Sequence, residues 1–189
     1  MGCRSIIRLL VVGCCLMSVG SCQDADYTYC NLPAKFVFEN AYQAPALYTA
    51  CNSMGEFCTI TFSRDGKEFV FKGSSTTSNV PLTAIVGYNG FVLGLSGLVV
   101  GLPNIPEMGA DVSRVVCYEL SCPNCYAERG ISRRLRLQDG GIARCQRCTR
   151  QYDLNNLGIM NSDTTGISLY RYRVSYNQMS NTLVVSNTR

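Results

Sequence analysis

The chain has 189 residues, a formal net charge of +4, twelve cysteines, and neither histidine nor tryptophan. The absence of histidine excludes histidine-ligated catalytic zinc, Ser-His-Asp and Cys-His nucleophile systems, and haem attachment through C-x-x-C-H. The length and apolar content suit one domain with its own core, so we expect a single domain with a small insertion.

The first residues have the pattern of an export signal. Arg4 and Arg8 give a positive start, residues 6–17 are apolar apart from Arg8, and a Val-Gly-Ser-Cys sequence ends at Cys22. This segment resembles a bacterial lipobox, which implies a signal peptide over residues 1–21 and a lipid on Cys22. An ordinary signal peptide cut nearby is the alternative. The apolar run is shorter than a transmembrane span, which takes about 20 residues.

A lipid on Cys22 implies a protein anchored in the bacterial cell envelope. We expect the outer membrane, with another envelope protein as partner. The polar residues 22–29 then form a tether between the lipid and the domain. No later segment predicts a membrane span, because glycines interrupt the apolar stretch 91–102. An exported lipoprotein rarely meets nucleic acid, so we expect no nucleic-acid partner.

Most of the chain from Cys30 onward predicts β-strands. Alternating or apolar stretches rich in β-branched and aromatic residues cover 35–39, 56–62, 68–72, 81–86, 91–100, 115–120, 133–138, 169–176 and 182–186. Asp65-Gly66 is a hairpin-turn signal, and residues 177–181 form the turn of a terminal hairpin. Any helix is short, and one is expected within 44–51. We therefore predict an all-β domain over residues 30–189, an antiparallel barrel or sandwich with a metal-binding tip.

Two C-x-x-C pairs carry the clearest chemical signal. Cys122 and Cys125 form the first pair, and Cys145 and Cys148 form the second. Two thiolates at this spacing can bind one metal, and two such pairs make a tetrahedral S4 site suited to zinc, a single iron or an iron-sulfur cluster. We predict that the four thiols converge on one centre, in a rubredoxin-like or zinc-ribbon-like subdomain over residues 117–153.

The second C-x-x-C pair lies in a strongly basic stretch. Seven arginines and one acid, Asp139, lie between residues 129 and 150. Guanidinium groups near thiols favour the thiolate form and offset the excess negative charge of a divalent metal bound by four thiolates. Solvent-exposed strand faces explain the same charges equally well.

Four further cysteines follow the expected signal peptide and tether. Cys30, Cys51, Cys58 and Cys117 are even in number and could form two disulfides in an exported protein. Buried free cysteine is also a common small apolar residue. Their spacing does not determine which of these holds, or the pairing.

Residues 145–154 resemble the second cluster loop of Rieske proteins, which runs Cys, two residues, His, then Gly-Ser-x-Phe/Tyr-Asp. Residues 115–122 likewise resemble the strand that leads into the first Rieske loop, and the resemblance covers roughly residues 97–187. It implies a Rieske-like fold with the metal at its tip. Cys148 stands where the second loop has histidine, and Cys125 lies one residue beyond the first loop's histidine. Any cluster should therefore be more reducing than a Rieske centre.

Three functions remain open at this point. Zinc leads among the metals, because two C-x-x-C pairs commonly hold one ion, and the expected function is a structural zinc site on an interaction domain. The alternative is an electron carrier with an all-Cys iron or 2Fe-2S centre. Cys117, Cys122 and Cys125 reproduce the plant-type ferredoxin spacing, although Cys117 lies in an alternating strand and we leave it out of the ligand set. Thiol-disulfide exchange at the first pair lacks the βαβ context of thioredoxins.

An enzyme has little support in the sequence. The glycine-rich stretch 94–101 matches neither the Walker nor the Rossmann pattern, and its glycines suit close strand packing. The chain cannot build the second iron site of a Rieske oxygenase, which takes two histidines and a carboxylate. A redox-active protein would therefore be an electron carrier rather than a hydrolase or an oxygenase.

Overall fold

The computed structural model describes residues 29–82, 90–110, 112, 114–161 and 166–187. The first seven strands are β1 (Ala34–Phe38), β2 (Glu56–Phe62), β3 (Glu68–Lys72), β4 (Thr77–Pro81), β5 (Val92–Leu93), β6 (Leu98–Leu102) and β7 (Val116–Glu119). They are followed by β8 (Leu135–Gln138), β9 (Ile142–Cys145), β10 (Gln151–Asp153), β11 (Ile159–Met160), β12 (Arg171–Tyr172), β13 (Val174–Asn177) and β14 (Thr182–Ser186). The helices are a 3-10 turn η2 (Ala41–Gln43), α2 (Pro45–Asn52) and α4 (Pro123–Arg129).

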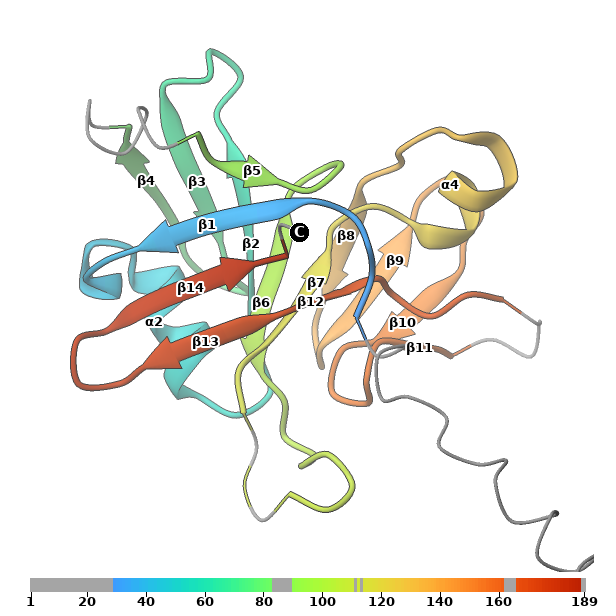
Figure 1. The fold of residues 1–189 in the computed structure, drawn as a ribbon. Coiled ribbons are helices and arrows are strands. Elements are labelled where there is room, and N and C mark those ends of the chain that lie inside the picture. Colours follow the sequence, from blue (N-terminus) through green and yellow to red (C-terminus); the bar gives the residue numbers. More distant parts are fainter. Residues whose placement is uncertain (1–28, 83–89, 111, 113, 162–165, 188–189) are drawn as a thin grey trace, which may run out of the picture.

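The strands form three antiparallel sheets. One four-stranded sheet has the order β13-β14-β1-β5, the six-stranded sheet has the order β12-β7-β6-β2-β3-β4, and the other four-stranded sheet has the order β11-β10-β9-β8. This last sheet and α4 form a tip that stands to one side of the other two sheets (Figure 1). The predicted all-β domain is confirmed in its coarser form: the described residues are mostly β, in antiparallel sheets, with the helices α2 and α4 in addition. The barrel form and the Rieske-like relationship stay predictions.

The six-stranded sheet is a shared wall between two cores. Along β6, Leu98 and Val100 pack into the core beneath α2, whereas Val99 between them packs into the core of the tip. On β7, Cys117 joins the α2 core and Tyr118 joins the tip core. Successive side chains of a strand point to opposite faces, so a strand buried on both faces is continuously apolar. This alternation determines which cysteine reaches which core.

The predicted hairpins match the structure closely. The strands 56–62, 68–72 and 182–186 have exactly the predicted bounds, and Gly66 has the positive φ of 69° that the β2–β3 turn needs. The expected short helix is α2, with Pro45 in its first turn.

Three predicted strands differ from the structure. The prediction that a strand begins at residue 81 is wrong, because β4 ends at Pro81. Residues 83–86 of that predicted strand lie outside the described residues. β4 is polar because it pairs only with β3 at a sheet edge. The stretch 91–100 divides into β5 and β6, and the stretch 169–176 divides into β12 and β13, which belong to different sheets.

The expected signal peptide over 1–21 and Cys22 lie outside the described residues, as does the expected tether up to residue 28. Tyr29 is the first described residue, and the centre of its ring lies 4.9 Å from the Cζ atom of Arg173. In the described part of the chain, no helix is long and apolar enough to cross a membrane.

Candidate metal centre

The four thiols of the two C-x-x-C pairs meet in the tip. The four Sγ atoms all lie within 4.8 Å of one another. The Sγ atoms of Cys122 and Cys148 are 3.6 Å apart, and those of Cys125 and Cys145 are 3.8 Å apart. A tetrahedral ion with metal–sulfur bonds of about 2.3 Å sets its ligand sulfurs about 3.8 Å apart. The prediction that the two pairs converge on one metal-sized centre is confirmed.

The first pair lies where the chain passes from β7 into α4. Cys122 precedes Pro123, the first residue of the helix, and its carbonyl accepts a hydrogen bond from the Tyr126 N–H at 3.1 Å. Gly130 ends α4 in the left-handed conformation. This one-turn spacing places the Cys125 thiol beside that of Cys122. Helix α4 was not predicted, because seven residues are too few for a recognisable helical period. The sequence does contain a proline at its start and a glycine after its end, which are helix start and stop signals.

The second pair lies in the turn from β9 to β10. The Cys145 N–H donates to the Arg150 carbonyl at 2.9 Å, which closes the turn that carries Cys148. Thr149 follows with φ 61°, a left-handed conformation that is unusual for a β-branched residue. Such strain costs on the order of 1–3 kcal/mol and persists where the surroundings hold it in place. The geometry of the second pair is therefore imposed by its turn.

Tyr152 supports the thiol cluster from behind. Its hydroxyl lies 3.2 Å from the Cys122 Sγ and accepts a hydrogen bond from the Asn124 side chain at 2.9 Å. Asn124 also exchanges two hydrogen bonds of 3.0 Å with the Ile167 main chain. Because the Asn124 amide donates to the Tyr152 oxygen, the Tyr152 O–H is free to donate to the Cys122 sulfur. Groups in this position orient metal ligands and adjust their basicity.

Tyr152 and Asn124 were not identified as site residues from the sequence. Both lie within or beside a C-x-x-C loop, Asn124 inside the first pair and Tyr152 four residues after Cys148. A buried polar side chain at such a position is the signal that could have identified them, but burial is known only from the structure. Tyr152 is fully buried and Asn124 is 4% exposed.

The four thiols differ in exposure and acidity. Cys122, Cys125 and Cys145 are buried, and Cys148 is partly exposed. Burial raises the pKa of the Cys122 and Cys125 thiols above the usual range. Burial also raises the pKa of Cys148, but the Arg150 main-chain N–H and the three neighbouring thiols outweigh it and lower that pKa to about 7. Metal binding to the cluster therefore displaces protons, chiefly those of Cys122 and Cys125.

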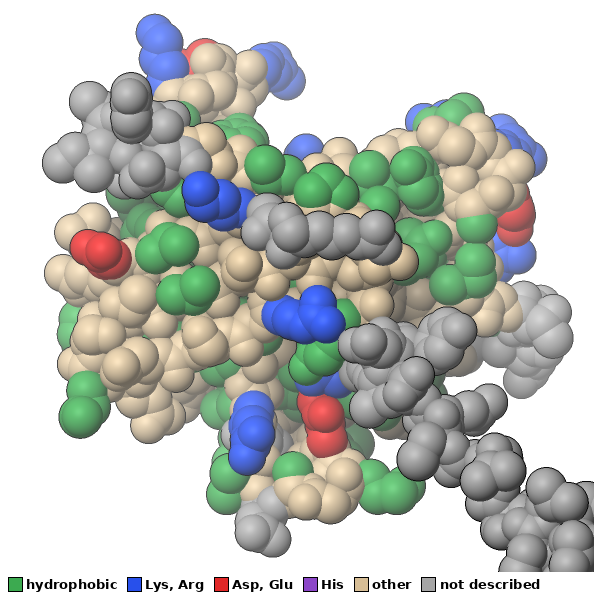
Figure 2. All heavy atoms as spheres, viewed as in Figure 1, with side chains coloured by type: hydrophobic (Ala, Val, Ile, Leu, Met, Phe, Trp, Pro, Cys, Tyr) green, Lys and Arg blue, Asp and Glu red, His purple; other side chains and the backbone are tan. Residues whose placement is uncertain are grey.

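Three arginines and Glu128 lie beside the exposed side of the cluster. Arg129, Arg133 and Arg147 line a depression of about 270 Å³ beside Cys125 and Cys148. Figure 2 shows Lys and Arg side chains at the outer end of the tip. Their positive charge offsets the negative charge that four thiolates bring to a divalent metal.

Cys117 does not belong to the cluster. It packs with Cys51 and Cys58 in the α2 core, on the opposite face of β7 from Cys122. The residues that carry the ferredoxin-like spacing are therefore divided between two cores, and the ligand set without Cys117 is the one that the structure brings together.

The other cysteines among the described residues form no disulfide. Cys30, Cys51, Cys58 and Cys117 are all free thiols. Cys58 and Cys117 lie in one row across three strands, separated by Val100 of β6. Two strand spacings amount to about 10 Å, beyond the Cα separation of about 7 Å that a disulfide can bridge. Burial raises the pKa of Cys51 to about 12, so this thiol behaves as an apolar core residue.

The glycine-rich loop between β5 and β6 holds a carboxylate of the chain itself. The Leu95 and Ser96 N–H groups donate to the buried Glu119 carboxylate at 2.8 and 3.0 Å. The Tyr172 hydroxyl and the Ser121 N–H donate to it at 2.6 and 2.9 Å. A side chain at Gly94 would overlap the Glu119 carboxylate. Through Glu119, the loop thus holds Ser121, the residue that precedes Cys122.

The arrangement has the chemistry of a closed tetrahedral S4 site. All four positions around an ion are occupied by sulfur, which suits zinc or iron and leaves no position for a substrate. No other group of histidine, cysteine or acidic side chains in the described residues has metal-binding geometry. Comparisons with protein families, with curated proteins and with solved structures found no match to this chain.

Proposed function

We propose that this protein is a membrane-anchored lipoprotein whose Rieske-like domain holds one structural zinc ion through Cys122, Cys125, Cys145 and Cys148. The domain would use its stabilised tip to bind another protein of the bacterial cell envelope. The observation that carries the proposal is the mutual spacing of the four Sγ atoms, all within 4.8 Å of one another. That spacing matches the ligands of a single tetrahedral ion.

The construction of the tip supports a structural role for the ion. Its sheet consists of strands of two to four residues, and three of the four ligands belong to its small core. Strands this short bury little surface of their own, and the core of the tip depends on side chains from the six-stranded sheet as well. A metal that joins α4 to the β9–β10 turn would supply the missing stability, because structural zinc binding is coupled directly to folding.

The anchor and the Rieske-like relationship rest on sequence features. The proposed anchor rests on the basic start, the apolar run and the small residues before Cys22. The Rieske-like relationship rests on residues 145–154, 115–122 and the order of the strands that follow. The cysteines at the positions of the cluster histidines are consistent with a site rebuilt for a single ion.

Metal analysis tests the zinc proposal. Protein purified anaerobically should contain one zinc per chain, show no visible absorption, and lose zinc to a chelator. Protein that retains no metal when zinc is supplied at equimolar concentration would contradict the proposal. For the anchor, Cys22→Ala should move the protein from the membrane fraction to the soluble fraction, and membrane retention of this variant would refute the lipid anchor.

A mononuclear iron centre for electron transfer is the second candidate. The observation that favours it is the partial exposure of Cys148, which places one ligand sulfur at the protein surface beside a basic depression. An electron would have a short path from such a ligand to an acidic partner. Iron in place of zinc would absorb in the visible and bleach on reduction. A two-iron cluster fits less well, because its ligand pairs bind different irons and must lie further apart than these four sulfurs.

A further inference from the structure

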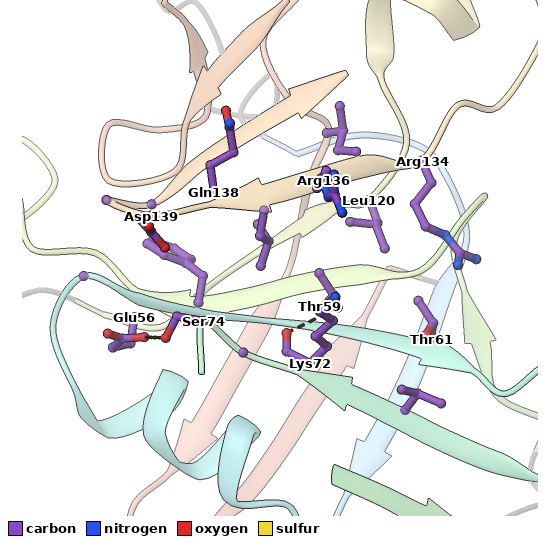
Figure 3. A pocket seen from close by; sticks show the side chains of 18 of the residues that line it. Glu56, Thr59, Thr61, Lys72, Ser74, Leu120, Arg134, Arg136, Gln138 and Asp139 are labelled. Atoms are coloured by element: carbon purple, nitrogen blue, oxygen red, sulfur yellow. Dashed lines mark hydrogen bonds between the residues drawn. The ribbon is translucent and has the colours of Figure 1, made fainter. Parts of the chain in front are cut away.

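A cleft separates the tip from the six-stranded sheet. β7 and β8 run together only briefly, where the Leu135 N–H donates to the Leu120 carbonyl at 2.8 Å, and the two sheets diverge beyond that point. The space between them is a cavity of about 650 Å³. Figure 3 shows β2 and β3 on one side of it and the β8 segment on the other. The cavity is large enough for a small organic ligand.

Unpaired cations from both sides line the cleft. Arg134 and Arg136 extend from the β8 segment, and Lys72 lies across from them on β3 (Figure 3). In the part of the chain that the structure describes, none of the three has an ion-pair partner. Cations without partners on the walls of one cleft repel one another, and an anion between them would relieve that repulsion.

The acids of the cleft lie apart from Arg134. Glu56 and Asp139 are at one end and Arg134 is at the other (Figure 3). Glu56 accepts a hydrogen bond from Ser74 at 2.8 Å. A ligand with an anionic group at one end only would meet the cations and avoid the acids, whereas a ligand with anionic groups at both ends would be repelled.

Apolar side chains line part of the cleft, beside the polar Thr59, Thr61, Ser74, Gln138 and Gln146. Leu120, Leu135 and Phe57 are buried, and Val70 and Leu137 are partly buried. These side chains offer an apolar surface between the charged groups, so the part of the ligand that they contact should be apolar as well.

The edge of β8 supplies one further donor. Successive N–H groups of a strand point to opposite edges, so the Leu137 N–H points the same way as that of Leu135, away from β9. The Leu135 N–H is bonded to Leu120, but the Leu137 N–H has no partner among the described residues. An anionic group in the cleft could accept this hydrogen bond in addition to those of the arginines.

The closed end of the cleft is held rigidly. Gly141 in the β8–β9 turn packs so closely on Phe57 and Asn155 that a side chain there would overlap both. Asn155 donates to the Gly140 carbonyl and accepts from the Asn104 N–H, both at 3.0 Å. These contacts join the turn to the end of the six-stranded sheet, so the cleft is preformed and a ligand need not order its walls.

We propose that this cleft binds a small amphiphilic anion, with its single anionic group between Arg134, Arg136 and Lys72 and its apolar part against Phe57 and Leu137. The site goes beyond the proposed metal function and contains none of the four ligand cysteines. Binding at the cleft and metal content can therefore be measured separately, so failure of one proposal does not decide the other.

The fluorescent dye 8-anilinonaphthalene-1-sulfonate tests the proposal, because it joins one sulfonate to an apolar ring system. The protein used is the metal-loaded chain with Cys22→Ala, since acyl chains would themselves bind the dye. We expect one site per chain. N-phenyl-1-naphthylamine, the same ring system without the sulfonate, should bind about fivefold more weakly, the upper range for an exposed ion pair. Equal affinity for the two dyes would overturn the anionic requirement.

Variants locate the dye. Arg134→Gln and Arg136→Gln should each weaken dye binding about two- to fivefold at unchanged metal content. Arg64→Gln, an exposed change in the β2–β3 turn outside the cleft, should leave dye binding unchanged. If the three variants bind the dye alike, or if no dye binds, the site is refuted.

Competition identifies the ligand class. Dodecanoate should displace the dye at concentrations at which inorganic phosphate does not, because only dodecanoate offers an apolar part. Equal displacement by phosphate would show a simple anion site and overturn the amphiphile proposal.

Discussion

Replacing Cys148 by serine should weaken zinc binding strongly, whereas the same replacement at Cys117 should leave it unchanged. The Cys148 Sγ lies 3.6 Å from that of Cys122 inside the four-sulfur group. Cys117 is only five residues from Cys122 in sequence but packs in the α2 core. The pair of variants therefore compares one loss of a thiol inside the site with one outside it.

The expected magnitude follows from the closed ligand set. Structural zinc sites bind with about 10–16 kcal/mol, so one of four thiolates accounts for roughly 3 kcal/mol, or about a hundredfold in affinity. Because Cys148 is partly exposed, water can replace its sulfur and limit the loss. At the fully buried Cys117, a hydroxyl in place of the thiol should cost about 1–3 kcal/mol of unfolding free energy without changing the metal affinity.

The assay is competition for zinc with a colorimetric chelator, combined with urea unfolding of each metal-loaded variant. Cys148→Ser should lose zinc at a chelator concentration that leaves the wild type and Cys117→Ser loaded. Cys117→Ser should show only the lower unfolding free energy. Equal loss of metal from both variants would refute the ligand assignment and return Cys117 to the ligand set, as the ferredoxin-like spacing requires.

Three further predictions follow from the site. Tyr152→Phe removes the hydroxyl beside the Cys122 sulfur and should lower zinc affinity about tenfold in the same chelator competition. An unchanged zinc affinity would show that the hydroxyl has no part in the site. Thr149→Gly should raise the unfolding free energy of the metal-loaded protein by about 0.5–1 kcal/mol, because glycine adopts φ 61° without strain, and a lower value in urea unfolding would contradict this. Zinc affinity should rise with pH, because protons compete with zinc for the Cys122 and Cys125 thiols, whose pKa is raised by burial. The rise should be steepest below about pH 7, where Cys148 is protonated as well. A zinc affinity that does not change between about pH 6 and pH 8 would contradict the displacement of protons.

Local signals were sufficient for several strands and for the two halves of the site. The Asp65-Gly66 turn and the alternating residues on each side of it gave the exact bounds of β2 and β3. The C-x-x-C spacing identified the two halves of the site, each with two thiols three residues apart. These features depend on residues close together in the chain, where turn chemistry, strand period and metal geometry act over a few residues.

The remaining features depend on contacts between distant segments. Only the fold shows that Cys117 and Cys122 lie in different cores, because that depends on both faces of β7 being covered. The Tyr152 hydroxyl reaches the Cys122 sulfur only after two loops have packed together. The cleft between the tip and the six-stranded sheet likewise forms only because β8 diverges from the chain after β7 beyond the hydrogen bond between Leu135 and Leu120. The sequence determined which groups the chain offers for metal binding, and tertiary packing decided which of them meet, because burial and long-range proximity are properties of the whole fold.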